Sequence, residues 1–363
     1  MLRARLLPPL LGTALAMLCA IAAPAAARVA PGFVGLADDD LIDASASARQ
    51  HSLEAEHTAG AGTLRQSFDW ARIERDPGHY EFGEYDAVVT DAARAGIRIL
   101  PVLTNPPSFR SARPRKHARH GLYPPKHFAD MGRFAAALAR RYGPGGELWK
   151  ADPGLPTLPI RSWQIWNEPN LTIYWETGPS PRRYVKLLRT VGKAIKKVDR
   201  KAEILTAGMP QSNLGIPFER FVAGIYKAGG KSAFDTLAVH PYARGAHGVV
   251  LAARLARRLM NSHGDRRGRM WITEFGWATS GPRSVFRVSR KGQAKRIRAA
   301  LLGLARRRSS LRLRGVVYHK WRDTRHPPKH GDFFGNHTGL LKASGRRKPG
   351  YFAFRRAALA LER

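Results

Sequence analysis

The chain has 363 residues, of which 44% are hydrophobic, so it has ample apolar material for a large folded core and shows no sign of a disordered protein. It carries 62 Lys and Arg against 27 Asp and Glu, which gives a formal net charge of +35. Such a balance attracts polyanions, but the sequence has no zinc-finger spacing and no aromatic-basic repeat, so we do not expect nucleic acid as a partner. The positive charges are spread along the chain, and we interpret them mainly as solvated surface. Binding to an acidic cell-wall polymer is a second hypothesis.

The first 27 residues have the pattern of an export signal. Arg3 and Arg5 precede an almost wholly apolar run from Leu10 to Ala23, and small residues at 24–27 offer a cleavage site before Arg28. The run is shorter than the ~20 residues that a spanning helix needs, so we expect cleavage and not a retained anchor. No later segment is apolar enough to span a bilayer. The sequence therefore predicts a signal peptide at 1–27 and a secreted, extracellular domain at 28–363.

Cysteine and histidine give no support for disulfides or metal sites. The single cysteine, Cys19, lies inside the apolar run and would be removed with it. The 13 histidines show no HExxH motif and no paired ligand spacing. We therefore predict no metal and no cofactor, and we expect a monomer.

Eight short apolar stretches, most of them followed by a helical pattern, predict strands. They begin near Pro31, Gly62, Ile97, Arg161, Glu203, Phe234, Met270 and Arg314. Each interval is long enough for a strand and a crossover helix, which together take ~30 residues or more. Continuous apolar runs are typical of parallel strands that are buried on both faces. We predict an α/β fold, a single-domain (β/α)8 TIM barrel. The rival fold, a doubly wound open sheet, normally shows an early Gly-rich phosphate turn, and the sequence has none.

Helical patterns lie between the strands. They cover Tyr85–Arg94, Phe128–Tyr142 and Pro181–Val198, the last with Ser180 as its N-cap and proline at its first position. A long polar loop, Asn105–Lys126, follows the third strand. In a barrel, loops after the strands build the substrate site.

Two glutamates stand directly after predicted strands. Glu168 ends the fourth strand in QIWNEPN, and Glu274 ends the seventh in WITEFGW. A carboxylate in this position lies at the mouth of a barrel. Hydrolysis of a glycosidic bond needs two carboxylates, one to donate a proton to the leaving oxygen and one to attack or to activate water. Either glutamate alone is explained as well by a surface salt bridge, but the two together, each flanked by tryptophan, argue against coincidence.

From about Gly32 to Arg355, the sequence resembles the glycoside hydrolases of clan A, especially the cellulase-like members of families 5 and 39. The most specific element is Asn167-Glu168-Pro169, where the family keeps its acid/base, and Glu274 matches the family's nucleophile. The resemblance implies a secreted, retaining hydrolase of O-glycosidic bonds in a poly- or oligosaccharide. A second carboxylate nearby would favour protonation of Glu168, as a general acid requires.

The resemblance also implies roles for polar residues at other strand ends. Arg65 matches the arginine that bonds the nucleophile, and Tyr242 matches a tyrosine that contacts it. His240 is expected to line the sugar site, and Asn167 to bond the sugar 2-hydroxyl. From the residues alone, Arg65 is also compatible with another carboxylate partner, and His240 with a packing role.

Aromatic residues and one asparagine complete the predicted substrate site. Trp321, after the eighth strand, matches an aromatic platform for the sugar, and Trp277 is a further candidate for stacking. Trp163 and Trp271 lie inside strands and are expected in the core. Asn105 stands where many family 5 enzymes carry a histidine, and we expect it to contact substrate.

Two other classes of function remain open at this stage. A catalytically silent carbohydrate-binding barrel would keep the tryptophans without needing both glutamates. A basic adhesion protein for cell wall or nucleic acid would depend on charge alone. Transglycosylation shares the covalent intermediate of the hydrolase. The sugar, the linkage, and endo or exo action depend on loop shapes.

Overall fold

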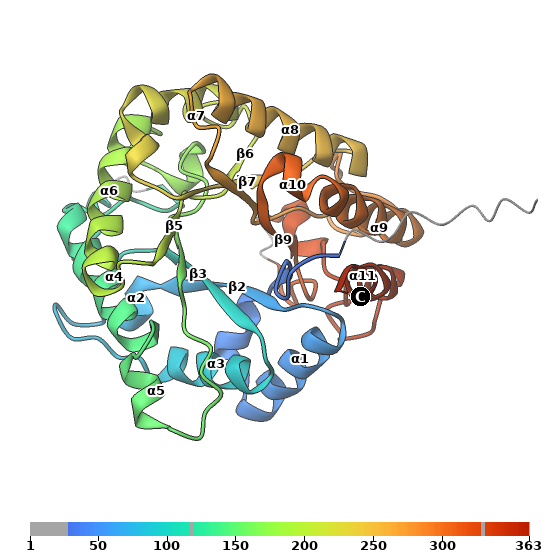
Figure 1. The fold of residues 1–363 in the computed structure, drawn as a ribbon, viewed down its shortest axis with the longest axis horizontal. Coiled ribbons are helices and arrows are strands. Elements are labelled where there is room, and N and C mark those ends of the chain that lie inside the picture. Colours follow the sequence, from blue (N-terminus) through green and yellow to red (C-terminus); the bar gives the residue numbers. More distant parts are fainter. Residues whose placement is uncertain (1–27, 117–118, 328–330, 363) are drawn as a thin grey trace, which may run out of the picture.

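The structure, a computed structural model, is a (β/α)8 barrel and describes residues 28–116, 119–327 and 331–362 (Figure 1). The predicted export signal at 1–27 lies outside the described residues. The strands pair in parallel in the order β5-β4-β3-β2-β1-β9-β8-β7-β6. β5 also pairs with β7, which closes the ring. The predicted fold class is confirmed.

The strands lie where the continuous apolar runs predicted them. Their bounds are β1 (Val34–Ala37), β2 (Thr63–Asp69), β3 (Arg98–Thr104), β4 (Ser162–Ile165), β5 (Glu203–Leu205), β6 (Met209–Pro210), β7 (Thr236–His240), β8 (Arg269–Ile272) and β9 (Leu313–His319). β5 and β6 share the fifth position of the barrel, because the strand predicted from Glu203 is interrupted over residues 206–208. β7, β8 and β9 therefore occupy the sixth, seventh and eighth positions.

The helices surround the ring of strands (Figure 1). Their bounds are α1 (Ala46–Thr58), α2 (Trp70–Ile73), α3 (Gly83–Arg94), α4 (Phe128–Tyr142), α5 (Glu147–Ala151), α6 (Pro181–Val198), α7 (Phe218–Lys227), α8 (Ala246–Ser262), α9 (Arg290–Arg306), α10 (Arg308–Leu311) and α11 (Pro349–Glu362). Helices α4 and α6 have the predicted bounds, and Ser180 caps α6 by accepting a hydrogen bond from Arg183 N at 3.3 Å. Within the described ranges, no helix has the length and hydropathy needed to cross a lipid bilayer.

The main core lies between the strands and the helices. Helix α4 contributes Met131, Phe134, Leu138 and Tyr142, which recur every three or four residues and are fully buried. Burial of one such side chain contributes about 1.5–3 kcal/mol relative to leaving it exposed. The solvent face of the same helix is basic. The alternation of apolar and basic residues thus sets which side of α4 packs on the barrel.

Two buried carboxyl groups meet where β1 leads into α1. Asp38 follows β1, and Glu56 lies on the inner face of α1, where Ser52 Oγ donates to its Oε1 at 3.3 Å. Burial, and then the charge of Asp40, raise the pKa of Asp38 to about 7. Burial, and then the charge of Asp38, raise the pKa of Glu56 well above its usual range. Burial thus favours the protonated form of Glu56 next to Asp38.

This pair predicts a stability that falls as pH rises. Because both pKa values are raised by folding, the folded chain binds protons more tightly than the unfolded chain, and the stabilisation is complete below about pH 4. The contribution of Asp38 is lost as pH rises through about 7, and that of Glu56 is lost as pH rises above the usual carboxyl range. In Glu56→Gln, the side-chain amide keeps a hydrogen-bond donor, but the residue no longer has a carboxyl group that ionises. We expect its thermal midpoint to fall less than that of the wild type between pH 5 and pH 8, by the equivalent of up to about 1.4 kcal/mol per pH unit. Tryptophan fluorescence during heating measures this.

Glu54→Gln on the exposed face of α1 is the matched control, since it removes the same charge without touching the pair. Its melting curve should follow the wild type at every pH. Parallel pH dependence in wild type and Glu56→Gln would contradict a raised pKa of Glu56.

Candidate active site

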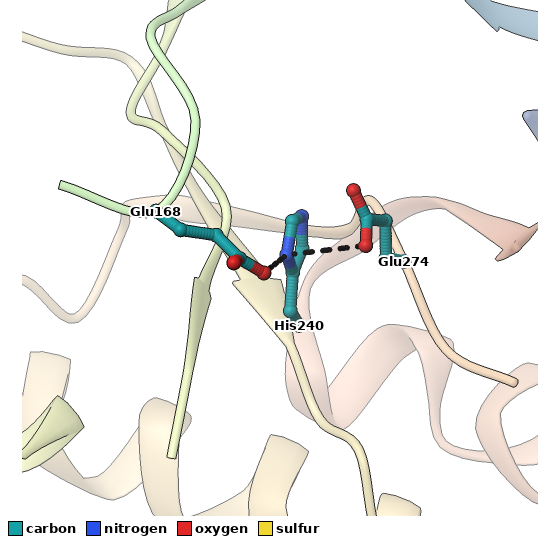
Figure 2. A group of neighbouring side chains, drawn as sticks. All are labelled: Glu168, His240 and Glu274. Atoms are coloured by element: carbon teal, nitrogen blue, oxygen red, sulfur yellow. Dashed lines mark hydrogen bonds and ion pairs between the residues drawn. The ribbon is translucent and has the colours of Figure 1, made fainter. Parts of the chain in front are cut away.

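The two candidate catalytic glutamates come together at the carboxyl ends of the strands. Glu168 lies three residues after β4, and Glu274 lies two residues after β8, at the fourth and seventh positions of the ring. Each has 8% of its surface exposed. Figure 2 shows His240, the last residue of β7, between them. Its Nδ1 lies 2.6 Å from Glu168 Oε1 and 3.5 Å from Glu274 Oε2, and an oxygen of each carboxylate lies within 4.8 Å of one on the other.

The backbone is bent to aim Glu168 into this gap. Trp166 and Glu168 have φ of 74° and 42°, in the left-handed region that residues other than glycine seldom adopt. Such a conformation costs of order 1 kcal/mol per residue and needs local support. The support comes from Glu168 N, which donates to Gly208 O at 3.0 Å, and from Trp166 Nε1, which donates to Tyr174 O at 2.7 Å.

Gly208 explains why the fifth strand is interrupted. A Cβ atom at this position would lie 1.9 Å from His240 Nε2 and 2.6 Å from Thr273 Oγ1. A separation below 3.0 Å is a clash, so any side chain here would displace the imidazole. The gap between β5 and β6 thus makes room for His240 beneath the two carboxylates.

Arg65, on β2, organises the site around Glu274. One terminal nitrogen of its guanidinium donates to Glu274 Oε1 at 2.7 Å, and the other donates to Asn167 Oδ1 at 2.8 Å. Its Nε donates to Gln164 Oε1 at 3.2 Å. The Tyr242 hydroxyl donates to Glu274 Oε2 at 2.8 Å. Both oxygens of Glu274 are therefore held by donors, one on β2 and one in the loop after β7.

The environments of the two glutamates separate their pKa values. Burial raises the pKa of Glu168; its hydrogen bond to His240 opposes this, and the charge of Glu274 adds to it. Burial acts in the same direction on Glu274, but the interactions with His240 and then with Arg65 outweigh it and hold its pKa at about 2. Around neutral pH, Glu274 is an anion, whereas Glu168 is biased toward its acid form. Paired carboxyl groups in this state are suited to an acid and a nucleophile.

Most of the residues predicted for the site meet there. Arg65, Asn167, His240 and Tyr242 all lie within hydrogen-bonding distance of Glu168, of Glu274 or of one another. Asn105 does not join them. Its side-chain nitrogen donates to both carboxylate oxygens of Asp69, at 2.9 and 2.8 Å. This interaction with one carboxylate holds the loop after β3, and the contact of Asn105 to substrate stays a prediction.

The prediction that Trp277 and Trp321 form a sugar platform is wrong. Trp277 is fully buried and donates its Nε1 hydrogen to Ala243 O at 2.8 Å. Trp321 is 2% exposed, with its ring 5.9 Å from that of Tyr351 on α11. No face of either indole is open to a ligand, because the loops after β7 and the C-terminal helix cover them. All eight tryptophans of the chain are 7% exposed or less, including Trp163 and Trp271, which were predicted for the core.

The eighth strand presents His319, which the sequence analysis missed. His319 is the last residue of β9, and its Nδ1 lies 3.2 Å from Thr338 Oγ1. Burial lowers its pKa to about 4, so the imidazole is neutral at neutral pH. Its place at the end of the predicted eighth strand, two residues before Trp321, indicates a residue at the mouth of the barrel.

Phenylalanines form the aromatic wall that tryptophan was expected to supply. Phe286, after β8, and Phe334, after β9, have ring centroids 5.9 and 5.2 Å from that of Tyr242 and 4.6 Å from each other. They are half-buried, and Phe333 beside them is 48% exposed. The side of the site next to Tyr242 is therefore apolar. No sequence motif marks these residues, because Phe286 lies in an irregular loop and Phe334 in a short 3-10 helix between loops.

Glu168, His240 and Glu274 also form a group with ligand types that bind divalent cations. The other contacts disfavour that use. Arg65 and Tyr242 already bond both oxygens of Glu274, and a guanidinium at 2.7 Å repels a cation. The arrangement is suited to proton transfer and nucleophilic attack.

Comparison with known proteins gives a structural likeness alone. No protein-family model and no curated protein matches the sequence. A family 39 glycoside hydrolase from the gut symbiont Bacteroides cellulosilyticus has a TM-score of 0.68 and 18% identity over 93% of this chain and 64% of its own. A glucosidase from Croceicoccus marinus has a TM-score of 0.65 and 15% identity over 91% of this chain and 68% of its own. An endo-β-1,4-mannanase from Thermotoga petrophila has a TM-score of 0.59 and 14% identity over 91% of this chain and 77% of its own. The chain thus spans about two thirds of the first two structures, and it shares the (β/α)8 barrel of these glycoside hydrolases.

Proposed function

We propose that this protein is a retaining glycosidase that hydrolyses O-glycosidic bonds of a poly- or oligosaccharide. The observation that carries the proposal is the pair of buried glutamates on the fourth and seventh strands, with opposite protonation preferences and oxygens within 4.8 Å. Carboxyl groups of retaining enzymes are ~5–5.5 Å apart, whereas those of inverting enzymes are ~6.5–9.5 Å apart to admit a water. The short gap favours double displacement.

In the first step, Glu274 attacks the anomeric carbon while the proton of Glu168 moves to the leaving oxygen. The glycosidic bond breaks, and a glycosyl ester forms on Glu274. In the second step, Glu168 takes a proton from water, the hydroxide attacks the anomeric carbon, and Glu274 leaves as a carboxylate. Transfer to a sugar hydroxyl in place of water follows the same route.

The surrounding residues have supporting roles in this scheme. Arg65 keeps Glu274 ionised, and Tyr242 orients its second oxygen. His240 Nδ1 forms a 2.6 Å hydrogen bond with Glu168 Oε1, which fixes the carboxyl group toward the gap. Asn167, held by Arg65 through its Oδ1, presents its amide nitrogen for the sugar 2-hydroxyl.

The two glutamates weaken the alternative of a silent carbohydrate-binding barrel, because such a protein needs neither an acid nor a nucleophile at its sugar site. The names of the structural neighbours, a glucosidase and a mannanase, suggest neutral β-linked hexosides as the first substrates to test. We also propose that the protein is exported, on the composition of residues 1–27.

Removal of either glutamate tests the proposal. We expect Glu274→Ala to reduce kcat on aryl β-mannosides or β-glucosides by ~10³-fold or more, since no nucleophile remains. Glu168→Ala should lower kcat by ~10²–10⁴-fold on substrates with poor leaving groups. The loss of kcat should be much smaller on dinitrophenyl glycosides, because their leaving group departs without being protonated. Chromogenic assays measure both, and proton NMR of the first product should show retention of the anomeric configuration.

Glu176→Gln, which alters a half-buried carboxylate in the loop after β4, is the control and should keep wild-type turnover. An unchanged rate in Glu274→Ala would refute the enzymatic proposal. Inversion at the anomeric carbon would refute double displacement while leaving glycoside hydrolysis in place.

The pKa of about 2 for Glu274 predicts the pH profile. Activity needs Glu274 ionised and Glu168 protonated, so kcat/KM should fall only near pH 2 on the acid side, and on the alkaline side at a pH above the usual carboxyl range. Arg65→Gln removes a cation that stabilises the Glu274 anion. We expect the acid limb of its profile, the fall of kcat/KM at low pH, to move to higher pH by about 1–3 units. Tyr242→Phe should shift the acid limb by less.

Arg49→Gln breaks a different buried ion pair, Arg49 to Asp91 at 2.7 Å, and should leave the limb in place. If the acid limb of Arg65→Gln coincides with that of the wild type, Arg65 does not control the charge of Glu274.

A further inference from the structure

Positive charge is concentrated on one side of the barrel. Helices α6, α7, α8 and α9 lie side by side along one arc of the outer surface (Figure 1). Helix α6 carries seven Lys and Arg, α7 two, α8 three and α9 six, against one carboxylate in the four helices, Glu219. By contrast, α3 carries three carboxylates and one arginine. We call the surface formed by α6, α7, α8 and α9 the basic wall.

The cations of the basic wall are not neutralised by the protein. Among the described residues, Lys196 is the one Lys or Arg of these four helices within 4.0 Å of a carboxylate, that of Asp235 at 2.8 Å. On the opposite side, the cations pair: Arg49 with Asp91 and Arg72 with Glu84, at 2.7 and 2.9 Å. Unpaired like charges at this density repel each other, so an anionic partner would bind here with a favourable Coulomb energy.

Two hollows in the basic wall have basic linings. One, of about 660 Å³, lies between α7 and α8 and is lined by Arg220, Lys227, Lys231 and His263. The other, of about 430 Å³, lies beside α8 and α10 and is lined by Arg254, Arg257, Arg258 and Arg307. Neither has an acidic residue in its lining. In the second hollow, Arg257 is buried and donates to the carbonyls of Gly268 and Asp265, whereas Arg254 and Arg258 are exposed. Arginine pairs with carboxylate in a two-point geometry.

We infer that the basic wall is a binding surface for a carboxylate-bearing polysaccharide, separate from the mouth of the barrel. The surface lacks what nucleic-acid binding adds to charge. Helices α6, α8 and α9 expose no aromatic side chain for base stacking, and the Tyr226 ring of α7 is stacked on His263 at 4.8 Å. The helices also lie flat on the barrel, so none projects into a groove of a duplex. The inference goes beyond the proposed function and does not require it.

Binding to immobilised polygalacturonate at rising NaCl tests the inference. The wall variant replaces four exposed cations of α8 and α9 that make no hydrogen bond in the structure: Arg254→Gln, Arg258→Gln, Lys295→Gln and Arg298→Gln. The matched control removes four exposed cations from other faces: Arg140→Gln, Lys150→Gln, Arg346→Gln and Arg356→Gln. Both variants lose the same net charge.

We expect the wild type to bind polygalacturonate, with the affinity falling steeply as salt rises, and not to bind neutral galactan. The wall variant should bind polygalacturonate at least about 10-fold more weakly, and its affinity should depend less steeply on salt concentration. The affinity of the control variant should fall by less than about 3-fold. Equal losses in both variants would overturn the inference, since net charge alone would then explain binding. Equal or tighter binding of duplex DNA at the same salt would also overturn it, in favour of a nucleic-acid surface.

Catalysis provides an independent readout. The wall variant should turn over a small aryl glycoside at the wild-type rate, and Glu274→Ala should bind polygalacturonate as the wild type does. Loss of turnover in the wall variant would contradict the separation of the two surfaces. An inactive wild type that still shows the difference between wall variant and control would refute the proposed function and leave the basic wall intact.

Discussion

The arrangement of the site depends on the hydrogen bonds that the Arg65 guanidinium makes. From the second strand it reaches Glu274 on the seventh and Asn167 and Gln164 on the fourth. Because Asn167 precedes Glu168 in the chain, one side chain sets both the charge of the candidate nucleophile and the position of the candidate acid. A charged pair this deeply buried loses much of its hydration on folding, so it contributes little to stability by itself. Its value lies in the fixed geometry of the two carboxylates.

The barrel and the catalytic pair were predictable because both follow from simple patterns. Parallel strands buried on two faces leave continuous apolar runs, and eight such runs gave the ring. Glu168 and Glu274 stood directly after two of these runs, which placed them at one end of the barrel before any contact was known. The helices α4 and α6 were predictable for the same reason, since their apolar and basic residues alternate at helical spacing.

Features that depend on irregular loops were not predictable. Whether the indole of Trp321 faces the mouth or the core is decided by its packing on Tyr351, about thirty residues later, and sequence gives no measure of that contact. Asn105 has the residue type of a substrate ligand, but its side-chain nitrogen donates to the carboxylate of Asp69 on the adjacent strand. The segregation of positive charge likewise became visible only when the fold set α6 to α9 side by side, because along the chain the cations look evenly spread.

The basic wall forms the flank of the barrel (Figure 1), whereas the two carboxylates lie at the carboxyl ends of its strands, so the two surfaces face different directions. A protein bound to an anionic matrix through its flank would have the mouth of its barrel facing along the matrix surface. Electrostatic attraction would hold the protein on the matrix without fixing it at one position, so the protein would diffuse along the surface. The mouth of the barrel would then face polysaccharide chains that lie beside the protein. The uneven distribution of charge would then act as an orienting device, in addition to any gain in affinity.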